Sequence, residues 1–130
     1  MNILVVDDHP NLVRVTALAL RALGCRTFTA GTTAAATQLL GTEKIDGIFL
    51  DVNLGAESGL DFLSQLVAQA VRPPVIMFTA QAKDEVVGEA LRRGALGCLI
   101  KPFNMEELGE QMKRLEQHRR DCAGGSSPDL

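Results

Sequence analysis

The chain has 130 residues, a length that fits one domain and is too short for two of ordinary size. Hydrophobic residues make up 46% of it and charged residues 22%, a composition typical of a globular domain with a full hydrophobic core. Thirteen basic residues against sixteen acidic ones give a net charge of -3, which argues against direct binding of nucleic acid or anionic membranes through a basic surface.

The cysteines and the first residues indicate a reducing, cytoplasmic setting. Cys25, Cys98 and Cys122 are odd in number and form no Cys-x-x-Cys pair, so they support neither a disulfide framework nor a zinc site. Met1 and Asn2 lead directly into an apolar run, without the basic segment of a signal peptide. The apolar runs fall far short of the ~18 residues that a membrane span needs.

Five short apolar runs have the length of β-strands. Four of them consist mainly of β-branched and large aliphatic residues, which is typical of strands covered on both faces. The run 26–29 alternates polar and apolar residues, and this pattern predicts a strand at the edge of a sheet. In chain order the predicted strands are Ile3–Val6, Arg26–Thr29, Gly47–Leu50, Val75–Phe78 and Gly97–Ile100.

Segments with helical spacing of apolar residues follow these runs. Pro10 suits the first turn of the first helix, and Gly24 is placed to end it. Asn104 and Glu107 form the pattern of a capping box at the start of the last helix. The predicted helices are Pro10–Leu23, Thr32–Leu40, Leu60–Val71, Asp84–Arg93 and one that starts at Met105. The apolar stripes consist of Leu12, Val15, Ala19 and Leu23 in the first helix and of Met105, Leu108, Met112 and Leu115 in the last.

The alternation of strands and helices predicts an α/β fold, a doubly wound parallel sheet with helices on both faces. Ligands of such folds bind at the carboxyl ends of the strands. After Cys122 the sequence loses periodicity and is rich in glycine and serine, which is typical of flexible linkers. We therefore expect one domain over residues 1–121 and a flexible tail, or the start of an inter-domain linker to an output domain, over residues 122–130.

Polar side chains with a definite chemistry follow four of the predicted strands. Asp7 and Asp8 come after the first strand, Asp51 after the third, Thr79 after the fourth and Lys101 after the fifth. Because the carboxyl ends of parallel strands meet at one edge of a sheet, we expect these side chains to share a small volume. Neighbouring carboxylates repel each other, and Mg2+ with its oxygen ligands relieves that repulsion. The set suits phosphoryl transfer to an aspartate, which gives an aspartyl phosphate.

Five segments of the sequence carry a resemblance to a known family. They are VVDD at 5–8, FLDV at 49–52, SGLD at 58–61, FTA at 78–80, and GA at 94–95 through KPF at 101–103. In this order and spacing the chain resembles the receiver domains of two-component response regulators over residues 2–121. The resemblance implies a flavodoxin-like fold with five parallel strands in the order 2-1-3-4-5 and five helices. It also implies self-phosphorylation and autodephosphorylation, without the activity of a classical enzyme.

The resemblance assigns a role to each aspartate at the strand ends. Asp51 would be the phosphoacceptor. Asp7 and Asp8 would hold Mg2+ together with Asp51 and the backbone carbonyl of Asn53. Asn53 would also lie, with Gln81, where it affects the attack of water on the aspartyl phosphate.

The remaining roles concern the phosphoryl partner and the switch. Lys101 would pair with the phosphoryl group, and the Lys101–Pro102 bond is often cis in the family. Thr79 would be the switch hydroxyl. At Cys98 the sequence departs from the family, which commonly has a Tyr or Phe that changes rotamer there; a thiol does not fill the same space. His9 is expected to be a helix cap or an exposed residue.

The resemblance also implies partners. The phosphoryl group would come from a phosphohistidine on a sensor histidine kinase or phosphotransfer protein. The receiver domain would then control an output domain or target protein, with transcription as one kind of output. Dimers in the family commonly use the last two helices, so a homodimer through these helices is expected.

Three other functions are alternatives to a receiver domain. A nucleotide- or flavin-binding module lacks support because the sequence contains neither GxGxxG nor GxxxxGK[ST]. Asp51, Val52 and Asn53 resemble the start of the DxD motif of haloacid-dehalogenase-type phosphatases, but there the nucleophile belongs after the first strand. The third is a pseudo-receiver that acts as an interaction module without phosphorylation. The departure at Cys98 keeps this alternative open.

Overall fold

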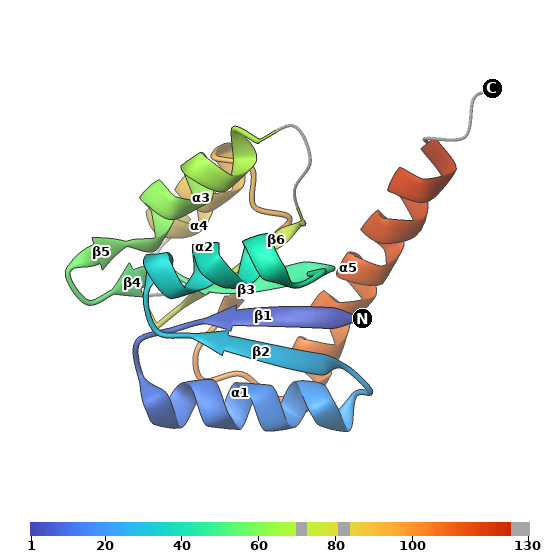
Figure 1. The fold of residues 1–130 in the computed structure, drawn as a ribbon, viewed down its shortest axis with the longest axis horizontal. Coiled ribbons are helices and arrows are strands. Elements are labelled where there is room, and N and C mark those ends of the chain that lie inside the picture. Colours follow the sequence, from blue (N-terminus) through green and yellow to red (C-terminus); the bar gives the residue numbers. More distant parts are fainter. Residues whose placement is uncertain (70–72, 81–83, 126–130) are drawn as a thin grey trace.

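The computed structural model, which describes residues 1–69, 73–80 and 84–125, contains a five-stranded parallel sheet (Figure 1). The strand order is β2-β1-β3-β6-β7, which is the order 2-1-3-4-5 expected for the five predicted strands. Their bounds agree with the predicted runs to within one residue at each end. The strands are β1 (Asn2–Val6), β2 (Arg26–Ala30), β3 (Gly47–Asp51), β6 (Val75–Thr79) and β7 (Gly97–Ile100).

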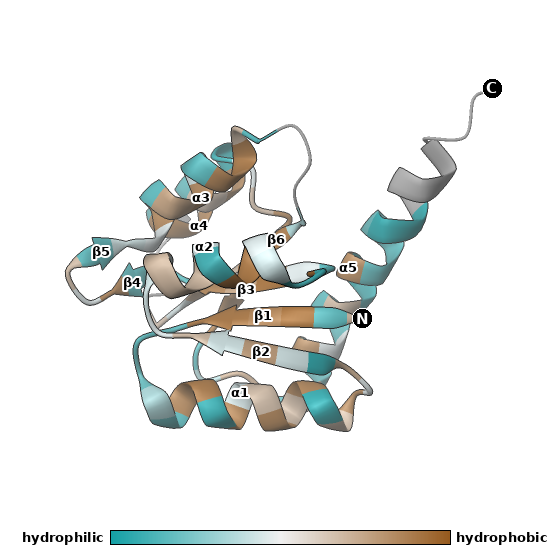
Figure 2. Ribbon diagram, viewed as in Figure 1, coloured by the Kyte–Doolittle hydropathy of each residue, from teal (hydrophilic) through white to brown (hydrophobic). Residues whose placement is uncertain are grey.

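The central strands are buried as their composition predicts. Every residue of β3 and β6 is buried, and β1 is buried after Asn2. β2 pairs only with β1 and has exposed residues at both Arg26 and Thr29, which confirms the predicted edge strand. In Figure 2 the brown of β1 contrasts with the paler and teal ribbon of β2. The apolar runs thus place a continuous hydrophobic layer between two layers of helices.

Helices cover both faces of the sheet. One core cluster joins Ile3, Val5 and Phe49 of the sheet to Leu20 of the first helix and to the last helix. The second cluster joins the opposite face to the three helices between them. The helices are α1 (Pro10–Ala22), α2 (Thr33–Thr42), α3 (Gly59–Val67), α4 (Asp84–Arg92) and α5 (Met105–Gly125), and α1 and α5 share one face.

The stripe predicted for α1 is wrong at Leu12, Val15 and Leu23, which are exposed, and only Ala19 of the predicted stripe packs against the core. Thr16, Ala17 and Leu20 are buried, whereas Val15 is 60% exposed. Most residues of α1 are apolar, so their spacing supports more than one stripe. The exposed large apolar residues of this helix and its end are Leu12, Val15, Leu18 and Leu23.

The start of α5 confirms the predicted capping box. The backbone N–H of Glu107 donates to Oδ1 of Asn104 at 2.8 Å, and the N–H of Asn104 donates to Oε1 of Glu107 at 3.1 Å. Leu108, Met112 and Leu115 are buried, but Met105 is 47% exposed and lies outside the core expected for it. Only the last three members of the predicted stripe therefore hold α5 against the sheet.

The far end of α5 continues beyond the expected domain boundary. The helix runs to Gly125, four residues into the segment 122–130 that was expected to be a flexible tail. Figure 1 shows it extending past the end of the sheet toward the C-terminus. Residues 126–130 lie outside the described residues, so the division into domain and linker stays a prediction. In the described part of the chain, no helix combines the length and the hydrophobicity that crossing a membrane requires.

A short hairpin that the sequence does not predict follows β3. Strands β4 (Asn53–Leu54) and β5 (Glu57–Ser58) pair in antiparallel fashion. Two-residue strands are too short to show a periodic pattern, so the sequence gives no signal for them. α3 begins directly after the hairpin and ends at Val67, earlier than the predicted end at 71, which lies outside the described residues.

Candidate functional site

The ends of three strands bring together the side chains that define the acidic site: Asp7, Asp8, Asp51 and Lys101. Asp7 follows β1, Asp51 is the last residue of β3, and Lys101 follows β7. All strands of the sheet run parallel, so these ends lie at the same edge. The side chains of Asp7 and Asp51 are 1% and 7% exposed, and that of Lys101 is 12% exposed. The expected convergence of these residues is therefore present in the structure.

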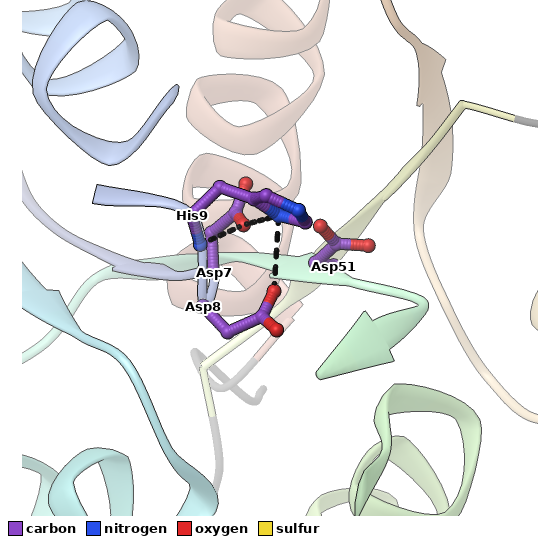
Figure 3. Close-up of side chains that lie close together, drawn as sticks. All are labelled: Asp7, Asp8, His9 and Asp51. Carbon is purple, nitrogen blue, oxygen red and sulfur yellow. Dashed lines mark hydrogen bonds and ion pairs between the residues drawn. The ribbon is translucent and has the colours of Figure 1, made fainter. Parts of the chain in front are cut away.

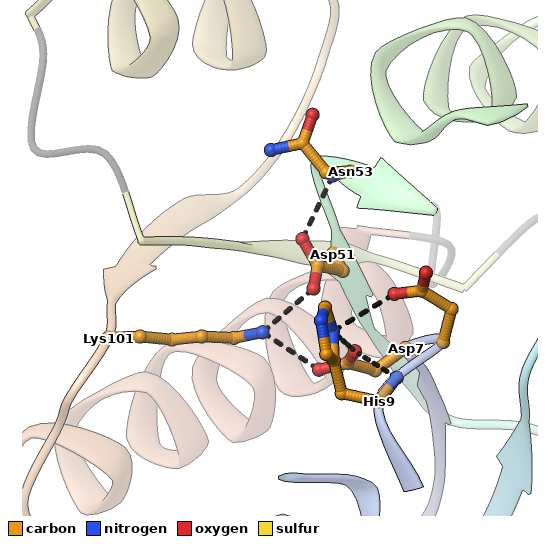
Figure 4. A network of polar contacts seen from close by, with 6 residues as sticks. Asp7, His9, Asp51, Asn53 and Lys101 are labelled. Atoms are coloured by element: carbon orange, nitrogen blue, oxygen red, sulfur yellow. Dashed lines mark hydrogen bonds and ion pairs between the residues drawn. The ribbon is translucent and has the colours of Figure 1, made fainter. Parts of the chain in front are cut away.

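Lys101 connects the two buried carboxylates (Figure 4). Its Nζ donates to Oδ2 of Asp7 at 2.8 Å and to Oδ2 of Asp51 at 2.7 Å. Two carboxylates this close would repel each other, and the ammonium group between them offsets that repulsion. The same ammonium group lies 5.4 Å from the ring centre of Phe78, which faces it from β6. Lys101 thus joins β1 to β3 electrostatically from the end of β7.

Burial and the lysine act in opposite directions on the carboxylates. Burial raises the pKa of Asp7, but Lys101 and the N–H of His9 outweigh it, so this pKa lies below its usual value. Burial dominates at Asp51 and, helped by the charge of Asp7, holds its pKa above the usual value despite Lys101 and Asn53. Burial disfavours charged Lys101, yet its hydrogen bonds to both aspartates raise its pKa. Lys101 is therefore charged at neutral pH.

Hydrogen bonds to the Asp51 side chain and to the backbone of the next residue hold Asp51 in position. The N–H of Asn53 donates to Oδ1 of Asp51 at 2.9 Å, and the N–H of Gly59 donates to the carbonyl of Val52 at 2.8 Å. Gly59 approaches the strand so closely that a Cβ there would lie 1.9 Å from the carbonyl oxygen of Asp51. The glycine of the SGLD segment is thus required for α3 to begin beside the acidic site.

Asp8 and His9 complete the edge of the site at the start of α1 (Figure 3). Nδ1 of His9 lies 3.0 Å from Oδ1 of Asp8 and 3.2 Å from Oδ1 of Asp7. The sequence predicts a helix cap or an exposed residue at this position, and His9 does stand at the N-cap with a side chain that is 64% exposed. Its side chain, however, makes no capping hydrogen bond. The run Asp-Asp-His was the signal for this proximity, but sequence spacing does not fix where a ring points.

The site fits a divalent cation. Asp7, Asp8, His9 and Asp51 each offer a ligand atom, and these atoms lie within 4.8 Å of one another. Oδ1 of Asp8 is buried and accepts no hydrogen bond from the described residues, although Nδ1 of His9 lies 3.0 Å from it. A buried carboxylate oxygen that accepts no hydrogen bond is costly, and a cation would satisfy it. The donor set is dominated by carboxylate oxygens, the ligands that hard divalent cations prefer.

Thr79 lies at the same edge, at the end of β6. Its side chain is buried, and its carbonyl accepts a hydrogen bond from the N–H of Lys101 at 2.8 Å. The Lys101–Pro102 peptide bond is cis, as the resemblance led us to expect. Beyond it, the ring of Phe103 stacks on that of Phe78, with 5.6 Å between the ring centres. Gln81, which was predicted to act near the site, lies outside the described residues.

Cys98 is on β7, paired with Met77 of β6. It is half-buried and packs against the core cluster that also contains Val86 and Ala90 of α4. Burial raises the pKa of its thiol above the usual value, so the thiol is protonated at neutral pH. Cys98 therefore behaves as a small apolar side chain beneath α4.

Comparison with known proteins agrees with this geometry. The family model of the response regulator receiver domain matches residues 3–113. The regulatory protein AtoC of Escherichia coli is 34% identical over 88% of this chain and 25% of its own length. Chemotaxis protein CheY-3 of Vibrio cholerae is 33% identical over 88% of this chain and 91% of its own length.

The solved structures show the same fold. The crystal structure of NtrX from Brucella abortus gives a TM-score of 0.88 at 29% identity, over 96% of this chain and 28% of that one. The chain spans about a quarter of the length of the first curated relatives that it matches. The family model, by contrast, covers most of this chain, including the acidic site at the ends of β1, β3 and β7. The chain belongs to the response regulator receiver domain family.

Proposed function

We propose that this receiver domain accepts a phosphoryl group on Asp51 and thereby controls an output domain or a partner protein. The observation that carries the proposal is the contact of Lys101 Nζ with the carboxylates of Asp51 and Asp7, at 2.7 and 2.8 Å. This contact places a fixed positive charge beside a nucleophilic oxygen at the ligand-binding edge of the sheet. Membership of the receiver family supports the same assignment.

The chain's own groups account for the transfer. An oxygen of the Asp51 carboxylate forms a bond to phosphorus while the bond from phosphorus to the donor's leaving group breaks. The leaving group keeps the electron pair. Lys101 stabilises negative charge on the phosphoryl oxygens, and Asp7 holds the ammonium group in place. The N–H of Asn53 orients the carboxylate before the donor arrives.

Mg2+ is the cation that we assign to the site. Asp7, Asp8 and Asp51 would supply carboxylate oxygens, and the backbone carbonyl of Asn53 would add a fourth oxygen. The buried, unsatisfied Oδ1 of Asp8 supports a cation at this position. When bound, Mg2+ neutralises charge on the phosphoryl oxygens.

We assign the switch to Thr79 and Cys98. Thr79 is buried at the end of β6 and offers a hydroxyl donor at the edge that would hold the phosphoryl group. Cys98 packs against the core cluster that includes Val86 and Ala90 of α4, and at its position the family commonly has an aromatic ring. A thiol has less volume to move than a ring, so the response of α4 would be smaller here.

The proposed partners follow from this chemistry. The donor is a phosphohistidine on a sensor histidine kinase or phosphotransfer protein. A homodimer through α4 and α5 is supported by exposed apolar side chains on and beside these helices, among them Leu91, Ile100 and Met105. The domain would end near residue 121, and the glycine- and serine-rich residues that follow would lead to the output domain.

The test is phosphorylation by acetyl phosphate, followed by intact mass. With Mg2+ present we expect one phosphoryl adduct on the wild-type protein, and none when EDTA replaces Mg2+. Asp51→Asn removes the nucleophile and should abolish the adduct. Asp61→Asn is the matched control, because the side chain of Asp61 is 72% exposed and pairs with Arg93, whereas Asp51 pairs with Lys101.

Two outcomes would contradict the proposal. An adduct that persists in Asp51→Asn would place the phosphoryl group on another residue. A folded protein that binds Mg2+ but forms no adduct with acetyl phosphate, or with phosphoramidate as a second donor, would favour a pseudo-receiver that acts as an interaction module.

A further inference from the structure

We propose that His9 is a nitrogen ligand of the cation site, so that this receiver domain binds divalent first-row transition cations such as Ni2+ as well as Mg2+. The inference rests on the proposed function in one respect only, that a cation binds among Asp7, Asp8 and Asp51.

The placement of the imidazole is the first argument. His9 stands at the N-cap of α1 with an extended backbone, a position where a side chain commonly caps the helix, yet it makes no capping hydrogen bond. The backbone N–H of His9 donates to Oδ1 of Asp7 at 3.0 Å, and this hydrogen bond holds His9 beside that carboxylate. Figure 3 shows the ring turned toward the aspartates.

The distances are the second argument. Nδ1 of His9 lies 3.0 Å from Oδ1 of Asp8 and 3.2 Å from Oδ1 of Asp7. Two ligands that bind one ion at right angles, each about 2.1 Å from it, lie about 3.0 Å apart. The nitrogen and the carboxylate oxygens are therefore spaced like adjacent corners of an octahedral coordination shell.

The chemistry of the donors gives the selectivity. Imidazole suits Ni2+, Zn2+ and related ions, whereas Mg2+ prefers oxygen ligands and retains its waters. The ring of His9 is 64% exposed, so it can adjust toward an ion without disturbing the core. The three aspartates serve both kinds of cation, and His9 adds affinity for one kind only.

If His9 is only a hydrogen-bond donor to the aspartates, the effect of its removal on cation affinity should have the opposite sign. If the Nδ1 hydrogen of His9 only donates to the carboxylates, the ring occupies space that a cation needs. Removal of the ring would then strengthen the binding of every divalent cation. The sign of the change in affinity therefore separates a ligand from a competitor.

The experiment is calorimetric titration of untagged protein with Ni2+ and, separately, with Mg2+ at one fixed pH. We expect His9→Ala and His9→Asn to weaken Ni2+ binding at least about tenfold, since loss of even an outer partner of a ligand costs that much. The Mg2+ affinity should change less than about twofold. His118→Ala, which removes the other histidine of the chain, is the control and should leave both affinities unchanged.

Each result bears on a different claim. Equal changes for Ni2+ and Mg2+, or tighter Mg2+ binding in the His9 variants, would overturn the role of His9 and leave the proposed Mg2+ site intact. No binding of either cation by the wild-type protein would overturn both. For variants that remain folded by circular dichroism, a second readout is the visible spectrum of bound Co2+, which should differ between the wild-type protein and His9→Ala.

Discussion

Lys101 is the residue on which the charge balance of the acidic site depends. It is 12% exposed and hydrogen-bonds two carboxylates that are almost fully buried. Removing one partner of a buried ion pair leaves an uncompensated charge, at a cost of about 3 kcal/mol. We expect Lys101→Met to lower the free energy of unfolding by about that amount at pH 7. Urea unfolding followed by circular dichroism measures it, with Lys113→Met, at an exposed position of α5, as the control.

The pH dependence of that loss has a definite sign. In the wild-type protein the lowered pKa of Asp7 contributes stability that is present above the unfolded pKa and lost as pH falls through the folded one. Without Lys101, only the hydrogen bonds from His9 and Asn53 still oppose burial, so both carboxylate pKa values rise and the variant gains stability as pH falls from 7 toward 5. The difference between the two proteins should therefore shrink over this interval. A difference that is equal at pH 7 and pH 5 would contradict the role given to Lys101.

Cys98 is the residue at which signalling in this chain is expected to depart from the family pattern. Because Cys98 packs against the core cluster that includes Ala90 of α4 and supplies no ligand atom of the acidic site, Cys98→Tyr should leave the rate of phosphorylation unchanged. The introduced ring should enlarge the response to phosphorylation. The chain contains no Tyr and no Trp, so the new tyrosine reports on its own surroundings through fluorescence. A spectrum that is the same with and without phosphorylation would remove Cys98 from the switch.

Helix α1 has one face that packs against the sheet and another face that is exposed. Leu20 is fully buried, while Leu18 is 56% exposed two residues earlier. We expect Leu20→Ala to lower the free energy of unfolding by about 3 kcal/mol, because it leaves a cavity in the core. Leu18→Ala, a matched change on the same helix, should cost less than about 0.5 kcal/mol. Equal losses in urea unfolding would show that the two faces are assigned wrongly.

Elements were predictable from the sequence wherever one pattern excluded the others. The buried strands, the edge strand and the capping box of Asn104 and Glu107 all carry such patterns, and the structure confirms them. The stripe of α1 failed because its apolar residues support several faces, and only the shape of the sheet selects among them. The hairpin β4–β5 was missed because two residues per strand give no period. The extension of α5 to Gly125 contradicts a glycine-rich composition that usually disfavours helix.

Across the whole molecule, the sequence predicts which residues form the site better than it predicts how their side chains pack. Topology brings Asp7, Asp51 and Lys101 to one edge whatever their rotamers, so their positions after successive strands were sufficient. The direction of the His9 ring and the depth of each carboxylate depend on side-chain packing, which spacing does not encode. The sequence therefore predicts which residues meet and leaves open how they touch.

The strand order has a consequence for the way the chain assembles. After β1 and β2 have paired, each later strand joins at the same growing side of the sheet: β3 beside β1, β6 beside β3, and β7 beside β6. The sheet can therefore extend in the order in which a ribosome releases its strands. In that sequence of events Asp7 and Asp51 become neighbours before Lys101 has emerged. The last strand thus supplies the counter-charge. A sheet that lacks β7 holds two neighbouring carboxylates without Lys101 and is therefore less stable than the finished sheet.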